Sequence, residues 1–272
     1  MIIFRRASDA FRRVEDREWL LLVLETLGVL IGILIAFELQ QWGTQRDQAA
    51  KHHELMERLF EESLNDVSLL RDMRDTLKPI LTREQRFAVR LAKSECPSND
   101  EFQAITTLSM YPAITPPTSV YQELMGAGGL SSIERKDVRQ KLAQFHGDLD
   151  WSQKQIEYFR TARIEPLSDS DPRERTHFDP TADEPEVSTF DGAALCQDEV
   201  FKSRVARATR AHTVYMNYIQ SPLEDAINVC VRLGDSLRRE CTPEYGGPLT
   251  GEDANYAKRV LTKMQRDKAE TT

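Results

Sequence analysis

Cysteine offers the most direct chemistry in this chain of 272 residues, which holds Cys96, Cys196, Cys230 and Cys241. No two of them form a Cys-x-x-Cys pair, so their spacing favours neither a zinc site nor a thioredoxin-like redox pair. An even number of cysteines outside the cytoplasm permits disulfides. On one straight helix Cys230 and Cys241 would lie about 16 Å apart, too far to bond. We expect one bridge from Cys96 to Cys196 or Cys241, with free buried thiols as the alternative.

Histidines and carboxylates give no recognisable catalytic or metal pattern. Adjacent His52 and His53 point about 100° apart on a helix, so they do not readily share a metal ion. The sequence has no His-Glu-x-x-His, no Gly-x-Ser-x-Gly elbow and no phosphate-binding glycine loop. Asp169 and Asp171 have a calcium-like spacing, but the glycine and bidentate glutamate of a calcium loop are missing. We therefore expect no catalytic residue, no cofactor and no metal site.

One ionisable residue, Glu25, interrupts an otherwise apolar stretch at residues 19–37. A charged group at membrane depth needs a partner, water or a proton. Glu25, Gly28, Gly32 and Ala36 follow one another at spacings that place them on one helix face. Small residues in this pattern let a second helix approach closely. The face is either a helix–helix interface that buries Glu25, or Glu25 reaches the headgroups and the glycines are incidental.

The apolar stretch is long enough to be a transmembrane helix. Residues 19–37 would span about 28 Å at roughly 1.5 Å per residue, close to the hydrocarbon thickness of a bilayer. Trp19 and Trp42 lie at its ends, where amphipathic rings prefer the interface. A signal peptide is the competing interpretation, but the residues after Phe37 make a poor cleavage site. We expect an uncleaved anchor, with its interface, over residues 19–42.

The flanking bases predict the orientation of this anchor. Residues 1–18 hold five arginines, whereas a similar length after the anchor holds Arg46, Lys51 and Arg58. Because positive charge favours the cytoplasmic side, residues 1–18 are expected to be cytoplasmic and residues 43–268 to lie outside the cytoplasm. In a Gram-negative bacterium this is an inner-membrane protein with a periplasmic domain.

The remaining chain has to position these residues, and its pattern is helical. Apolar residues from Met56 to Leu77 recur every three or four positions, so the anchor is expected to continue as a helix until Pro79 kinks or ends it. The helical pattern resumes through Leu91 and stops near Cys96. Further helices are expected over residues 118–124, 135–163, 198–239 and 252–268. The helix over residues 198–239 is expected to restart at Ser221-Pro222, with Val200, Val205, Val214, Tyr218, Leu223, Ile227, Val231 and Leu237 facing the core.

Residues 165–192 break the helical pattern. They hold four prolines and nine acidic residues against two basic ones. This composition is typical of an exposed loop. The fold class expected for the whole chain is therefore all-α, with one transmembrane helix continuing into an extracytoplasmic antiparallel helical bundle.

Two segments resemble an uncharacterised family of bacterial single-pass membrane proteins. The first is Ile31-Gly-Ile-Leu-Ile-Ala36, followed by Gln40-Gln41-Trp42 and Arg58-Leu59, and the family tends to carry a glutamate where Glu25 lies. The second is Thr118-Ser-Val-Tyr-Gln-Glu-Leu124, followed by Gly128-Gly129-Leu130 and Ile133. The chain departs from the family at Gly28, where the family has a bulky residue. The resemblance implies the anchored architecture and carries no activity.

These observations predict a membrane-anchored, extracytoplasmic interaction or scaffold protein. Its expected partners are the lipid bilayer and either another protein or a copy of itself, bound through the anchor. The net charge of −8 argues against nucleic-acid binding. The alternative is a periplasmic ligand-binding sensor with a separate signalling partner, because residues 1–18 are too short for an output domain. A hydrolase is the third hypothesis and has no supporting motif.

Overall fold

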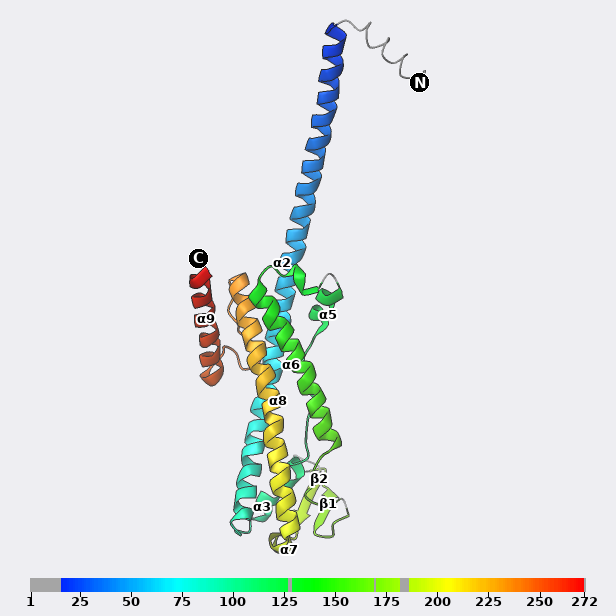
Figure 1. Cartoon of the computed structure of the whole chain (residues 1–272). Coiled ribbons are helices and arrows are strands. Elements are labelled where there is room, and N and C mark those ends of the chain that lie inside the picture. The colour runs from blue at the N-terminus through cyan, green and yellow to red at the C-terminus, as the bar shows by residue number, and fades with distance from the viewer. Residues whose placement is uncertain (1–15, 127–128, 169, 182–185, 272) are drawn as a thin grey trace, which may run out of the picture. The chain divides into compact units, whose positions relative to one another are not determined.

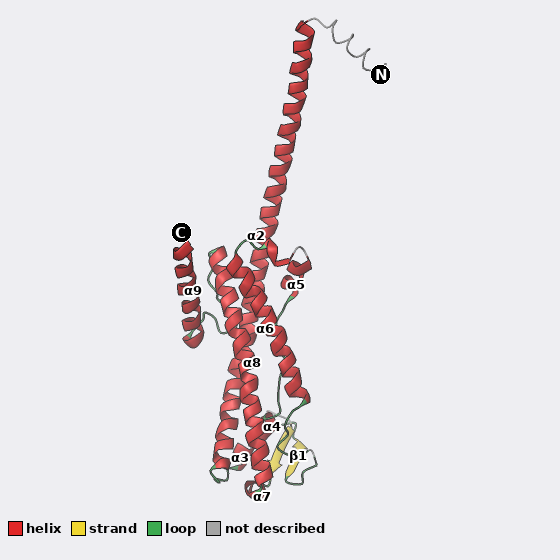
Figure 2. Cartoon of the chain, viewed as in Figure 1, coloured by secondary structure: helices red, strands yellow, loops and turns green. Residues whose placement is uncertain are grey.

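A computed structural model describes residues 16–126, 129–168, 170–181 and 186–271 of the chain. Most of these residues are helical, and one small two-stranded sheet accompanies the helices (Figures 1 and 2). The chain forms two compact units, Met1–Glu54 and Leu55–Thr272. Helix α2, Asp16–Ala92, begins in the first unit and ends in the second. Residues 1–15, most of the predicted cytoplasmic segment, lie outside the described residues.

The first unit consists, in its described part, of the beginning of α2. The apolar side chains from Val23 to Phe37 are exposed, and so is Trp42. In an ordinary globular domain a surface helix is apolar on one face and polar on the other. An exposed helix surface that is apolar over this length is therefore unusual for such a domain.

Pro79 lies inside α2, so the helix does not end there, as one of the two predicted alternatives had it. A proline removes one backbone hydrogen bond from a helix and costs about 3 kcal/mol. Pro79 is exposed, and the carbonyl that loses its partner is therefore accessible to water. Leu77 and Phe87 remain buried on either side of it. Burial of apolar side chains before and after Pro79 keeps the helix continuous through the proline.

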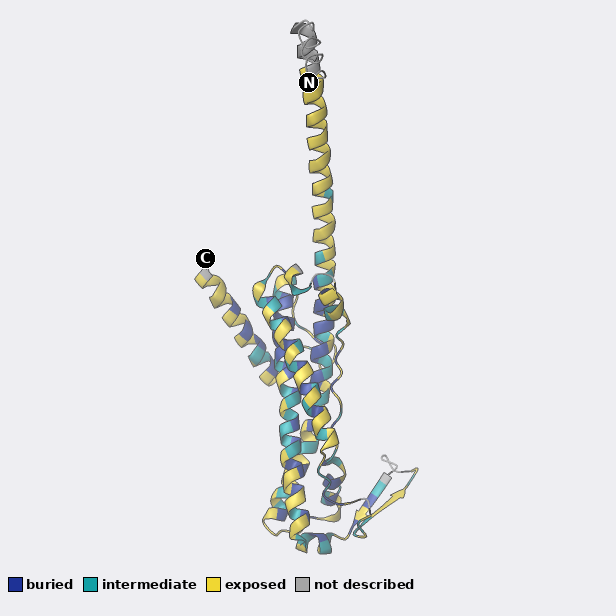
Figure 3. Ribbon diagram, turned by 45° about the vertical axis from the view of Figure 1, so that its right-hand side comes forward, coloured by how far each residue is buried: buried dark blue, intermediate teal, exposed yellow. Residues whose placement is uncertain are grey.

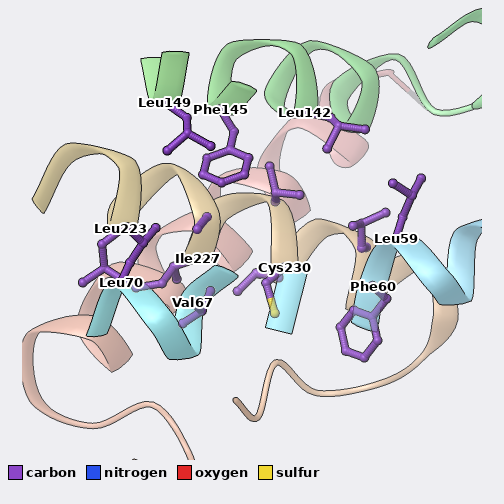
Figure 4. Packing of buried hydrophobic residues seen from close by; sticks show 14 of the residues in the cluster. Leu59, Phe60, Val67, Leu70, Leu142, Phe145, Leu149, Leu223, Ile227 and Cys230 are labelled. Carbon is purple, nitrogen blue, oxygen red and sulfur yellow. The ribbon is translucent and has the colours of Figure 1, made fainter. Parts of the chain in front are cut away.

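The second unit is built from the later part of α2 and the helices that pack on it. Its largest core joins α2 to α6, α8 and α9, and Figure 4 shows Val67, Phe145, Leu223 and Ile227 from three of these helices close together. The remaining helices are short. The bounds are α3 Asn99–Phe102, α4 Ala104–Thr107, α5 Ser119–Gly126, the 3₁₀ turn η1 Gly129–Ser132, α6 Lys136–Thr161, α7 Gly192–Gln197, α8 Glu199–Leu237 and α9 Gly251–Thr271.

Helix α8 also runs through its proline, Pro222, and the predicted restart at Ser221-Pro222 is wrong. Ile219, Leu223 and Ile227 are all fully buried, so the apolar face continues across the proline without a break. Val200, predicted to face the core, is 63% exposed at the first turn of α8. That turn is held instead by Asp198, whose carboxylate accepts the Val200 N–H.

Within residues 165–192, where the sequence predicted an exposed loop, the structure has two paired strands that form a β-hairpin. Strands β1, Glu174–Phe178, and β2, Glu186–Phe190, pair antiparallel, with Thr176 opposite Ser188. Their hydroxyl groups lie 2.8 Å apart, and Gln103 Nε2 donates to the Ser188 carbonyl oxygen. The prolines and acidic residues concealed the strands, since neither residue class favours a sheet.

The base of the hairpin belongs to a second apolar core. Phe190 stacks on Phe102 with ring centroids 5.9 Å apart, and Phe87 meets Phe102 edge-on at 5.2 Å. Phe201 and Leu195 complete the cluster from α8 and α7. Gly192 lies directly beneath Phe102, where a Cβ atom would come within 2.8 Å of the ring. The hairpin is therefore anchored at Phe190.

Candidate functional site

The first candidate site is the apolar surface of α2 in the first unit. The helix is long and apolar enough to cross a membrane, and none of its most apolar 18-residue window is buried. A helix from a soluble core would pass the same test of length and composition but would be mostly buried. The feature is thus an exposed apolar helix near the N-terminus, as a membrane anchor or a signal sequence would be.

The predicted interface residues Glu25, Gly28, Gly32 and Ala36 all lie on this exposed part of α2. A Cβ atom added at Gly28 or Gly32 would meet nothing within 4 Å. Both positions are thus open for a close helix–helix approach. That a second helix occupies this face stays a prediction.

A disulfide joins Cys96 to Cys196, one of the two partners that the sequence left open for Cys96. Cys96 follows the end of α2, and Cys196 lies in α7 beside the second apolar core. The bond closes a loop of 100 residues and ties the hairpin segment to the end of α2.

A second disulfide joins Cys230 to Cys241, with Cα atoms 5.7 Å apart, which corrects the expectation that this pair cannot bond. The expectation assumed one straight helix. Helix α8 ends at Leu237 because Arg238 adopts the left-handed conformation, and the Arg239 N–H closes back on the Gly234 carbonyl. The chain then returns along α8. A Cβ atom at Gly234 would lie 2.5 Å from the Arg239 carbonyl oxygen, so only glycine permits this return.

A buried polar centre links α2 to α8. His212 Nδ1 lies 2.6 Å from Glu84 Oε2, and neither side chain is exposed. The Thr107 hydroxyl donates to the other carboxylate oxygen at 2.6 Å. Tyr111 packs edge-on against the imidazole, and burial together with the Glu84 charge raises the pKa of Tyr111 to about 12.

The geometry of this centre does not match a nucleophilic triad. In such a triad the base contacts the hydroxyl and the acid contacts the base, whereas here the Thr107 hydroxyl contacts the acid. Glu84 and His212 are also closed to substrate, since both are fully buried. Among the described residues, no three His, Cys, Asp or Glu side chains come together as a metal site requires. We interpret the centre as a device that specifies how α2 and α8 pair.

Carboxylates of α2 also hold α5. Glu62 accepts the Val120 and Tyr121 N–H groups at 2.8 and 3.1 Å, so a side chain from another helix caps the N-terminus of α5. One turn further, Asp66 is 3% exposed. Burial and the neighbouring Glu62 carboxylate raise the pKa of Asp66 to about 8. Asp66 is therefore mostly protonated at neutral pH.

Helix α9 is held by a buried ionic cluster at its first turn. Asp253 accepts two hydrogen bonds from the Arg74 guanidinium, at 2.6 and 3.0 Å. Arg71 Nε lies 3.3 Å from the same carboxylate, and Arg71 also donates to the Tyr245 and Gly247 carbonyl oxygens. One carboxylate and two guanidinium groups thus attach both α9 and the segment before it to α2.

Two surface depressions are large enough for a ligand. A groove of about 580 Å³ runs along the end of α2, with Phe87 and Val89 in its apolar wall and Arg83 and Arg86 beside them. A smaller pocket of about 300 Å³ lies over Tyr111 and is lined by polar groups. These groups are Ser109, Glu157, Arg160, Thr161 and Arg163.

No protein-family model, curated protein or solved structure matches this chain. The function has to be inferred from the chain's own residues.

The buried centre was missed in the sequence, although a signal for it exists. Glu84 falls in the same apolar periodicity as Leu77, Phe87 and Leu91, and His212 falls in that of Tyr215. An ionisable residue at a core position needs a partner. Two such residues in separate helices predict a contact, but the sequence does not say which helices pack together.

Proposed function

We propose that this protein is a single-pass membrane protein whose second unit is an extracytoplasmic antiparallel helical bundle that binds another protein. The observation that carries the proposal is the joining of two features in one chain. An apolar helix with a fully exposed surface precedes a unit that contains two disulfides. Disulfides persist in oxidising compartments and are rare in the cytoplasm.

The charge pattern supports the proposed orientation. The arginines before the anchor favour a cytoplasmic N-terminus, and this places the disulfides on the oxidising side. The arginine count before the anchor and the two disulfides are independent observations, and both support the proposed topology. In a Gram-negative bacterium the second unit would be periplasmic, with the protein in the inner membrane.

An interaction role fits the second unit better than catalysis. Its buried polar pairs, Glu84 with His212 and Asp253 with Arg74, join helices to one another. Large aromatic side chains of this unit are exposed, in contrast, among them Trp151 and Tyr158 on α6 and Phe178 on β1. Exposed aromatic residues are enriched in protein interfaces.

Reporter fusions test the topology. Alkaline phosphatase fused after Thr272 should be active, and a reporter that works only in the cytoplasm should be inactive at the same position. In intact cells, all four cysteines should resist a maleimide reagent until a reductant is added. An active cytoplasmic reporter, or thiols that react without reductant, would exclude the proposed topology.

Crosslinking from membranes tests the interaction role. The full-length tagged protein, crosslinked in cells and purified in detergent, should carry a defined protein partner or a second copy of itself. A chain that remains monomeric and uncrosslinked over a range of reagent lengths would argue against this role.

The pocket over Tyr111 favours a second candidate function, that of a ligand-binding sensor. Arg160 and Arg163 supply guanidinium donors, and their ion pairs with Glu157 and Glu165 are exposed and therefore weak. A small carboxylate would fit the charge of these donors. In a thermal-shift screen of small carboxylic acids on the full chain, a hit lost in Arg160→Ala would favour the sensor. A screen without hits would leave the interaction role as the better proposal.

A further inference from the structure

The tip of the β-hairpin carries an unusual side chain. Phe178 is 74% exposed, the largest exposed fraction among the large apolar side chains of the described residues. It ends β1 and is followed by Asp179, whose carboxylate accepts the N–H and hydroxyl of Thr181. These bonds fix the orientation of the carboxylate, which lies one position after the ring in the sequence. The tip therefore presents an aromatic ring and an oriented negative charge to solvent.

The groove at the end of α2 has the complementary properties. Its wall contains the buried ring of Phe87 and the side chain of Val89, which is 52% exposed. Arg83 and Arg86 lie three positions apart on the same helix and line the groove together. Neither has an ion-pair partner among the described residues. The third arginine, Arg90, is neutralised by Glu101, which accepts two hydrogen bonds of 2.7 Å from it.

The hairpin tip does not reach the groove of its own chain. Phe190, at the base of the hairpin, is fixed on Phe102, and Gln103 holds the Ser188 carbonyl. The register places Phe178 opposite Glu186, at the far end of the strands. Four residues of strand separate Phe178 from the base, a distance of roughly 13 Å. Figure 3 shows the strands extending away from the helices.

We infer that the hairpin tip of one copy binds in the α2 groove of a second copy. The Phe178 ring would cover Val89 and Phe87, and the Asp179 carboxylate would accept hydrogen bonds from Arg83 and Arg86. An aromatic anchor beside a charge-assisted pair is the usual composition of an interface hot spot.

The contact is reciprocal within a twofold dimer. Asp100 and Glu101 line the groove, and Gln103, in the same short segment, holds the hairpin. Groove and hairpin therefore lie at the same end of the second unit, so two copies related by a twofold axis exchange two hairpins at once. The inference rests on the proposed interaction function and names its partner and surface. Anchoring both copies in one membrane would raise their effective concentration.

The test uses site-directed crosslinking of the full chain in membranes. Two differently tagged copies are coexpressed, one with Val89→Cys and one with Phe178→Cys, and treated with a short bismaleimide. A crosslinked mixed dimer is expected. The matched control replaces Phe178→Cys by Tyr158→Cys, since Tyr158 is an aromatic residue of similar exposure on α6. A control yield equal to the test yield would overturn the inference.

Charge reversal provides the second measurement. Arg83→Glu with Arg86→Glu should lower the crosslinked fraction about tenfold, the effect of losing about 1.4 kcal/mol of binding energy. Asp179→Arg in the partner copy should restore the crosslinked fraction. If the double arginine variant were merely misfolded, this change in the partner would not restore it. Absence of rescue would overturn the inference. If copies associate but the 89–178 crosslink is missing, the inference fails and the proposed interaction role stands. A crosslink from position 89 to an unrelated protein alone also overturns it.

Discussion

His212 Nδ1 lies 2.6 Å from Glu84 Oε2 in the interior of the second unit, where neither residue is accessible to solvent. The two residues are 128 positions apart in the sequence, so the contact specifies how α2 and α8 pair. A buried pair of this kind contributes little net stability compared with an apolar pair of the same shape. Removing one partner, however, lowers the free energy of unfolding, because the other polar group is left buried without its hydrogen-bond partner.

Glu84→Ala is accordingly expected to lower the free energy of unfolding by about 3–5 kcal/mol. Denaturant unfolding of the full chain in detergent, followed by helical circular dichroism, measures the change. The control is Glu157→Ala, which removes an exposed ion pair with Arg160 and should cost no more than about 1 kcal/mol. Equal costs for the two variants would show that burial of the Glu84–His212 pair has no energetic role.

Asp66 should make stability depend on pH. Its pKa is raised to about 8 in the folded protein, mainly by burial, whereas in the unfolded chain it is near its ordinary value of about 4. The folded state thus binds the Asp66 proton more tightly than the unfolded state does. The stabilisation of the fold that results is complete below pH 4 and is lost as the pH rises to 8. Wild type should be less stable at pH 8 than at pH 5, and Asp66→Asn should flatten this slope. Asp150→Asn, an exposed control, should leave the slope unchanged.

The two disulfides should contribute unequally to stability. Cys96–Cys196 closes a loop of 100 residues and Cys230–Cys241 one of 11. Loop-closure entropy predicts losses of about 4.7 and about 3 kcal/mol when each bond is removed. Double Cys→Ser variants of each pair avoid stray thiols, and denaturant unfolding compares them. A larger loss for the shorter loop would contradict the entropic argument for this protein.

Removing the Asp253 carboxylate should release α9. Asp253→Asn leaves the guanidinium groups of Arg71 and Arg74 without their shared charge, and Arg71 is only 4% exposed. Limited proteolysis is expected to cleave residues 242–250 faster in the variant than in wild type. Glu252→Gln, at the neighbouring exposed position, is the control and should keep the wild-type cleavage rate.

A substitution at Gly32 tests the predicted interface of the anchor. Gly32→Leu should weaken self-association of the anchor in a membrane reporter assay, because leucine prevents the close approach that glycine permits. Ile33→Leu alters a neighbouring, exposed position outside the small-residue face and serves as the control. An unchanged signal for Gly32→Leu would mean that the Gly32 face contacts lipid only.

Local pattern was enough to predict most helices of this protein. The apolar periodicity after Arg135 and after Asp198 predicted α6 and α8, because burial of one helix face repeats every three to four residues. The apolar run over residues 19–37 predicted a long apolar helix, and α2 exposes this surface from Val23 onward. These features depend on residues close together in the sequence.

Other features depend on contacts between residues that are far apart in the sequence, and tertiary structure decided these. Pro79 and Pro222 stay helical because packing of the flanking turns outweighs their local cost, and β2 forms because Phe190 finds Phe102. Cys241 meets Cys230 only because Gly234 lets the chain fold back over α8. Glu84 and His212 each violate their own apolar pattern, and the contact that satisfies both exists only once α2 and α8 pack together.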